Sequence, residues 1–156
     1  MDELLLDSSY LFPIFGIELE YRNFESVFSS LPEKYLVKYN PVSLIEAKWY
    51  VLRKSKKHRG RLDTLLQSYR TGLVSLLRDK RLESTPLTNE LIEELSDSLL
   101  SKFALRDYFD RLIYSTAAHL GCILLTEDRP LHELFGKVEN ELLKPRAVMT
   151  WKDLLS

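Results

Sequence analysis

The sequence is poor in the residues that mark disulfide-stabilised or disordered chains. It contains one cysteine, five glycines and six prolines in 156 residues. The single Cys122 excludes an internal disulfide and an all-cysteine zinc site, which fits a reducing compartment. The few glycines and prolines leave no room for a long disordered linker. We therefore expect one domain over residues 1–156, long enough to bury an apolar core.

Long apolar runs and a strong net charge are also missing. No apolar stretch approaches the roughly 20 residues that span a bilayer, and the first residues are acidic where a secretory signal would be basic. We therefore expect a cytoplasmic protein with no membrane contact. The net charge is −1, from 22 basic and 23 acidic residues, yet six of the nine residues from Arg53 to Arg61 are Lys or Arg. Positive charge is thus concentrated locally.

Two kinds of apolar pattern alternate along the chain. Short apolar or loosely alternating runs predict strands at 3–7, 35–42, 81–87, 122–126 and 147–150, the last at a sheet edge. Helical spacing predicts one or two turns at 10–16, helices at 24–31 (ending before Pro32), 62–77, 107–119 and 151–155, and helices beginning at Ser43, Thr88 and Arg129. This order predicts an α/β fold, with a mostly parallel sheet of about four or five strands flanked by helices.

Two aspartates directly follow predicted strands. Asp7 follows the first strand and Asp128 follows the strand at 122–126. Because ligands bind beyond the carboxyl ends of the strands in an open α/β sheet, both carboxylates are candidates for a site. Each also has a structural explanation. Asp128 is suited to cap the helix that begins at Arg129, and Asp and Ser are common in turns such as the one at Asp7.

Glu46 and Asp110 lie near the starts of predicted helices. Ser43 and Glu46 have the spacing of a capping box, in which the two side chains would serve only the helix end. Asp107 is suited to cap the helix at 107–119, and Asp110 lies in the first turn, where the helix dipole favours negative charge. Taken singly, each of these carboxylates therefore has a structural explanation too.

Taken together, the four carboxylates favour a site for a hard divalent cation. Mg²⁺ and Mn²⁺ prefer oxygen ligands. Clustered carboxylates repel one another and raise each other's pKa unless a cation neutralises them. A bound cation would also activate water for attack on phosphorus. We therefore interpret Asp7, Glu46, Asp110 and Asp128 as one candidate metal site.

Several segments resemble, in order, the motifs of PIN-domain nucleases. Residues 4–9 are similar to the family's opening strand with its Asp, and residues 42–47 to its helix with a Glu. Residues 110–117, Gly121 and residues 124–128 resemble its Asp-led helix, its small-residue segment and its strand ending in Thr-x-Asp. Residues 147–155 resemble its last strand and short helix. The resemblance spans essentially the whole chain.

The resemblance implies an endoribonuclease that depends on Mg²⁺ or Mn²⁺. It assigns Asp7, Glu46, Asp110 and Asp128 as metal ligands and catalytic carboxylates. Water would be the nucleophile, leaving a 5′-phosphate and a 3′-hydroxyl on the RNA. Compact members of the family are mostly toxins of the VapC type, which pair with an antitoxin protein and are frequently homodimers. Asp107 precedes the motif position by one helical turn, and Glu127 occupies the variable position of Thr-x-Asp.

Other functions are open to the same sequence. A PIN-like fold could bind RNA or protein without catalysis, although four close carboxylates would bring such a module little. A receiver-like signalling domain would need a Lys after a later strand, which is lacking. The segment 53–61 is either an RNA-backbone contact or a solvated helix end, and we favour the second.

The remaining candidates have structural interpretations. Trp49 and Tyr50 are expected in the core or at a dimer contact rather than stacked on bases. Cys122 is expected in the core rather than as a nucleophile. His119 and His132 have no spacing partner for zinc.

Overall fold

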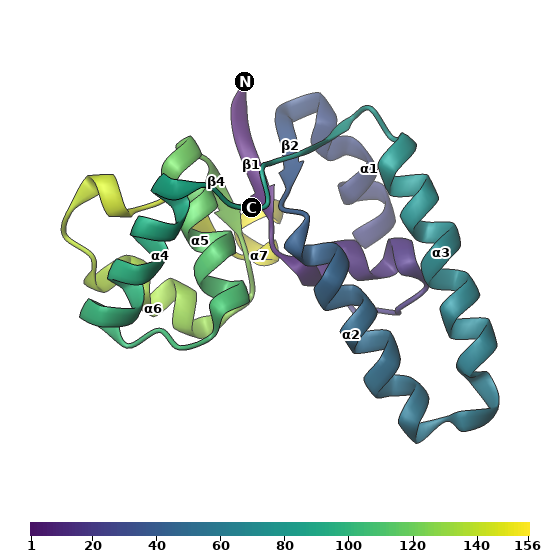
Figure 1. The fold of residues 1–156 in the computed structure, drawn as a ribbon. Helices are drawn as coiled ribbons and strands as arrows, with labels where there is room; N and C mark the ends of the chain where they lie inside the picture. Colours follow the sequence, from purple (N-terminus) through teal and green to yellow (C-terminus); the bar gives the residue numbers. More distant parts are fainter.

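Five parallel strands form the central sheet of the computed structural model, which describes residues 1–156 (Figure 1). The strand order is β3-β2-β1-β4-β5. The strands are β1 (Asp2–Leu6), β2 (Tyr35–Tyr39), β3 (Leu82–Ser84), β4 (Ile123–Leu125) and β5 (Ala147–Met149). Every predicted strand is present, with β5 at an edge as expected, and the predicted α/β fold with a parallel sheet is confirmed.

The central strands are buried on both faces, which explains their continuous apolar sequences. Because side chains alternate along a strand, Leu4 and Leu6 of β1 join one apolar cluster while Leu5 joins another. In β4, Leu125 belongs to the first cluster and Leu124 to the second. The sheet is therefore a partition between two cores, and each core needs its own layer of helices.

Helices cover both faces of the sheet, as Figure 1 shows. The first core lies under η1 (Ser8–Phe15), α1 (Phe24–Lys34), α2 (Val42–Lys57), α3 (Leu62–Arg78) and α7 (Trp151–Leu155). The second lies under α4 (Glu90–Phe103), α5 (Tyr108–Leu120) and α6 (Arg129–Lys137). Two short 3₁₀ turns complete the chain, η2 (Arg59–Arg61) and η3 (Glu141–Leu143). None of the helices combines the length and the apolar character needed to cross a membrane.

Two predicted helix ends were wrong. The helix α1 does not stop before Pro32 but runs to Lys34, because the N–H of Tyr35 donates to the carbonyl of Leu31 and closes the last turn. The helix α4 is capped by Asn89 rather than Thr88, since the Asn89 side chain accepts the N–H of Ile92 at 2.9 Å. Both differences arise from hydrogen bonds that spacing alone does not specify.

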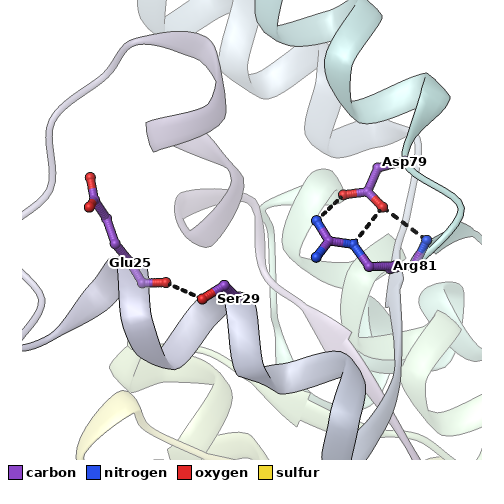
Figure 2. Close-up of polar contacts among 4 residues, drawn as sticks. All are labelled: Glu25, Ser29, Asp79 and Arg81. Carbon is purple, nitrogen blue, oxygen red and sulfur yellow. Dashed lines mark hydrogen bonds and ion pairs between the residues drawn. The ribbon is translucent and has the colours of Figure 1, made fainter.

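A short polar turn connects α3 to β3. The guanidinium of Arg81 donates to both carboxylate oxygens of Asp79, at 3.0 and 2.9 Å, and the Arg81 N–H donates to the same carboxylate (Figure 2). These bonds hold the pKa of Asp79 below its ordinary value. The turn between α3 and β3 fixes where the chain enters the edge strand β3.

Figure 2 also shows a separate contact on α1, in which the Ser29 hydroxyl donates to the carbonyl of Glu25.

The helix α3 packs against η1 at a glycine. A Cβ built on Gly72 would lie 2.2 Å from the carbonyl oxygen of Ile14, which no side chain tolerates. Gly136 in α6 has nothing within 4 Å of the same position. Gly72 therefore permits a close backbone contact, whereas Gly136 serves no such purpose.

We predict opposite effects when either glycine is replaced by alanine. Gly72→Ala should lower the free energy of unfolding by about 1–3 kcal/mol, because α3 must move away from η1. Gly136→Ala should leave it unchanged or raise it by up to about 1 kcal/mol, because alanine is the better helix former. Urea unfolding followed by circular dichroism measures both, and similar changes in the two variants would contradict the packing argument.

Candidate active site at the carboxyl edge of the sheet

The predicted carboxylates meet at the carboxyl edge of the sheet. Leu6 of β1 pairs with Leu125 of β4, so Asp7 and Asp128 leave the sheet beside one another. The strand order reverses at this point, since β2 lies on one side of β1 and β4 on the other. A cleft of about 470 Å³ opens there. Its lining comprises Asp7, Ser8, Ser9, Phe12, Glu46, Trp49, Tyr50, Arg53, Asp107, Phe109, Asp110 and Asp128.

Thr126 holds the two strand-end aspartates in place. Its buried hydroxyl donates to Oδ2 of Asp7 and accepts the backbone N–H of Asp128 at 3.0 Å. Oδ1 of Asp7 accepts the N–H of Ser8 at 2.7 Å. Thr126 and Asp128 of the Thr-x-Asp segment thus have distinct roles, because Thr126 orients both the turn that carries Asp7 and the turn that carries Asp128.

Asp128 occupies the N-cap position of α6 without capping it. Its side chain makes no capping hydrogen bond, so the structural explanation that its sequence position offered is wrong. Oδ2 of Asp128 is buried and has no hydrogen-bond partner. A buried carboxylate oxygen without a partner is costly. The protein's own hydrogen bonds therefore leave this carboxylate oxygen unsatisfied.

Glu46 does not belong to a capping box. The helix α2 begins at Val42 with no side-chain cap, and Ser43 is buried beneath the cleft instead. The Ser8 hydroxyl donates to Oε1 of Glu46 at 2.8 Å, and it accepts from the Ser43 hydroxyl at 2.8 Å. Glu46 is thus directed at the cleft by a serine pair that links η1 to α2.

Asp107 and Asp110 have different roles at the start of α5. The Asp107 side chain caps α5 by accepting the N–H of Asp110 at 3.1 Å, as predicted. The side chain of Asp110 is half-buried in the cleft. Glu127 lies outside the cleft, because its carboxylate accepts the N–H of Trp151 at 3.2 Å. The cleft therefore holds the four predicted carboxylates with Asp107 at its edge.

Burial and repulsion raise the pKa values of Asp7, Glu46 and Asp110. The pKa of Asp110 is raised to about 8, first by burial and then by the charges of Asp107, Asp128 and Asp7. Burial raises the pKa of Glu46 to about 7, with a further contribution from Asp7, against the lowering effect of the Ser8 hydroxyl. The pKa of Asp7 is raised as well, again chiefly by burial. The cleft thus carries more negative charge than its surroundings compensate.

The potential ligands in the cleft are oxygen atoms. The cleft lining contains no histidine or cysteine. No group of three acidic, histidine or cysteine side chains is arranged to hold a metal ion directly. The side chains therefore surround a shared space without forming a closed set of ligands.

Several contributors to the site were not predicted from the sequence. Ser8 and Thr126 hold carboxylates in place. Ser8 directly follows Asp7 and Thr126 precedes Asp128 by two residues, and this proximity to the motif aspartates is their only sequence signal. Arg53, at the start of the basic segment, is exposed and also lines the cleft. Trp49 is 58% exposed at the same cleft, so of its two expected places the core is wrong and the dimer contact stays a prediction.

The other sequence interpretations fit the structure. Cys122 is buried, and its pKa is raised to about 12, mainly by burial, so it is a core residue and a poor nucleophile. Tyr50 packs on Phe12 beside the first core, with ring centroids 5.1 Å apart. His119 is an exposed residue of α5, and His132 lies in α6, as expected of surface or helix residues.

Comparison with known proteins identifies the fold. No protein-family model and no curated protein sequence matches the chain. Its structure is similar to a chain in the crystal structure of VapBC2 from Rickettsia felis bound to a promoter DNA fragment, with a TM-score of 0.61 and 18% identity over 95% of this chain and 98% of that one. It is also similar to PAE2754 from Pyrobaculum aerophilum, with a TM-score of 0.56 and 16% identity over 99% and 94% of the two chains. The chain has a VapC-like PIN fold, as the motifs predicted.

The raised pKa values predict a dependence of stability on pH in the absence of metal. The folded chain keeps the protons of Asp110 and Glu46 up to pH values of about 8 and about 7, whereas the unfolded chain loses them near the ordinary values of 3.8 and 4.5. Between these limits the folded state binds more protons. The free energy of unfolding should therefore fall as the pH rises through this window.

Thermal unfolding in EDTA checks this dependence. The Tm of the wild type should fall between about pH 6 and about pH 8, and it should fall less in Asp110→Asn, which has no proton to lose. Asp97→Asn is the matched control, because Asp97 is exposed on α4 outside the cleft. An equal pH slope in the wild type and Asp110→Asn would contradict the raised pKa of Asp110.

Proposed function

We propose that this chain is a metal-dependent endoribonuclease that acts in the cytoplasm. The observation that carries the proposal is the gathering of Asp7, Glu46, Asp110 and Asp128 around one cleft at the switch point of a PIN fold. Each of these carboxylates had a structural alternative in the sequence. The hydrogen bonds leave Glu46 and Asp128 free of their capping roles, so a chemical role becomes the better explanation.

The cleft fits Mg²⁺ or Mn²⁺. Both cations prefer oxygen ligands, and Mg²⁺ usually keeps several waters and takes only one or two carboxylates directly. That habit suits carboxylates that surround a space without closing on it. The unpartnered Oδ2 of Asp128 is the buried atom that a cation would satisfy. Held among Asp7, Glu46, Asp110 and Asp128, by one or two of them directly and by the others through its waters, the metal would lower the pKa of a bound water and stabilise charge that develops on the phosphate.

The chain's own residues would position the reaction. Thr126 and Ser8 keep the carboxylates of Asp7 and Glu46 directed at the cleft, so little reorganisation is needed when substrate arrives. Arg53 lines the same cleft and offers a cation to a phosphate oxygen. In hydrolysis, the water oxygen would bond to phosphorus while the bond from phosphorus to O3′ breaks and O3′ takes a proton. The products are a 5′-phosphate and a 3′-hydroxyl.

A toxin–antitoxin setting follows from the VapBC2 likeness. We propose that the chain is the toxin of such a pair, blocked by an antitoxin protein and active as a homodimer. The alternative is a PIN-like module that binds RNA or protein without catalysis. The retained carboxylates favour catalysis, since such a module would gain nothing from their repulsion.

Cleavage of structured RNA in Mn²⁺ tests the enzymatic proposal. Wild type should cut, EDTA should abolish cutting, and Asp110→Asn or Asp7→Asn should each reduce the rate at least about 100-fold by removing a metal ligand. Asp97→Asn, which changes an aspartate outside the cleft, should cut like the wild type. Cleavage that survives EDTA, or that survives both cleft substitutions, would exclude the metal-dependent mechanism.

Growth of a bacterial host tests the toxin proposal. Induced expression of the wild type should arrest growth, and Asp110→Asn at equal abundance should not, because arrest would require cleavage. Asp97→Asn should arrest growth as the wild type does. Growth that continues with wild-type protein active in vitro would rule out a general toxin.

A further inference from the structure

One face of α2 leads away from the acidic cleft and carries an exposed tryptophan and several cations. Trp49 and Tyr50 each lie three or four residues from both Glu46 and Arg53, and Lys57 follows Arg53 by four, so these residues lie along one face of the helix. The first four line the acidic cleft. Tyr50 and Arg53 also line a second hollow of about 590 Å³, together with Lys54, Lys56, Lys57 and His58. The two hollows therefore adjoin along a single helix.

Trp49 lines the acidic cleft beside the two shared residues, and its ring is free. It is 58% exposed, it packs against no other aromatic ring, and its indole N–H makes no hydrogen bond. The other tryptophan, Trp151, is 3% exposed and donates its indole N–H to the carbonyl of Arg22 at 2.9 Å. A large exposed ring beside a charged cleft is a candidate contact for a ligand.

The basic end of α2 is not neutralised by the protein. The five ion pairs of the structure all lie elsewhere, and none includes a residue between Arg53 and Arg61. Cations favour the C-terminal end of a helix, but six in nine residues exceed what one helix end needs. This excess positive charge is complementary to a row of phosphates.

The neighbours of Trp49 decide among possible occupants. An apolar surface, such as a second copy of the chain, would bury Glu46 and Arg53 on either side of the ring, and burying charges is costly. A nucleic-acid strand offers a base to the ring and phosphates to the cations. The base must be unpaired, because a side chain can stack only on a base that is free of its own stack.

We propose that this face of α2 is a track for single-stranded RNA, with one unpaired base stacked on Trp49 beside the scissile phosphate and the following phosphates held by Arg53, Lys54, Lys56 and Lys57. The distance from Glu46 to Lys57 along the helix is about 16 Å. That length matches about five nucleotides at the 3.4 Å rise of a stacked strand. The proposal rests on the ribonuclease function and specifies its substrate as unpaired RNA.

Binding to a protein that cannot cut tests the track apart from catalysis. In an Asp110→Asn background, fluorescence anisotropy would measure the Kd of a labelled ten-nucleotide single-stranded RNA, of the same strand made abasic, and of an RNA duplex. Trp49→Ala should weaken binding of the intact strand about tenfold or more, and Trp49→Phe should retain most of it. Leu77→Ala is the matched control, since Leu77 is 60% exposed on α3 outside both hollows.

The salt dependence of binding tests the lysines that are proposed to hold phosphates. The double variant Lys56→Gln, Lys57→Gln should weaken all strands and lower the slope of log K against log salt by about 1.4, or about 0.7 for each phosphate that is no longer neutralised. Lys102→Gln, an exposed lysine on α4, should leave the slope unchanged. The abasic strand should respond to the lysine changes but not to Trp49→Ala.

Tryptophan fluorescence reports stacking directly. Because Trp151 is buried, quenching by the intact strand should come from Trp49 and should vanish in Trp49→Phe. Three results would each overturn the proposed RNA track. The intact strand does not quench tryptophan fluorescence, or Trp49→Ala binds it with the same Kd as its parent. In the third, sedimentation shows that Trp49→Ala impairs only self-association. Wild-type protein that binds through Trp49 but does not cut would instead overturn the ribonuclease proposal and leave the binding site standing.

Discussion

The hydroxyl of Thr126 joins the two halves of the site. It donates to the carboxylate of Asp7 at the end of β1 and accepts the backbone N–H of Asp128 beyond β4. These strands are neighbours in the sheet although Asp7 and Thr126 are 119 residues apart in sequence. The bond fixes two like charges side by side at a point where they repel. The remainder of the cleft, including Glu46 and Asp110, is arranged around that enforced pair.

Repulsion of this kind must be offset elsewhere in the fold. The two apolar cores on either side of the sheet supply the stabilising burial, because β1 and β4 contribute to both. The raised pKa values of Asp110 and Glu46 measure the opposing effect within the cleft. A stable scaffold that holds unfavourable charges together is typical of a site whose ligand completes the charge balance.

The sequence predicted the elements better than it predicted their polar contacts. Apolar periodicity indicated all five strands and the helices between them, because burial on one or both faces leaves a pattern in neighbouring residues. It could not distinguish the capping box at Ser43 and Glu46 from the serine pair that Ser43 and Ser8 form, since that contact joins residues 35 apart. The same limit hid the task of Thr126. Local spacing specifies local bonds, whereas the site is built almost entirely from distant ones.

The charge distribution along α2 shows that structural and functional explanations of a residue can coincide. The lysines lie at the C-terminal end of the helix, where they suit the helix dipole, and Glu46 lies toward its N-terminal end. The same placement separates a negative region that suits a cation from a positive region that suits phosphates, and Trp49 lies in the wall of the first, four residues before Arg53, which lines both. Helix stability alone would be satisfied by any exposed charges at the two ends. Helix stability does not explain why Trp49 is exposed on the same face of α2 without a packing partner. This exposed ring is the feature that favours a ligand along the helix.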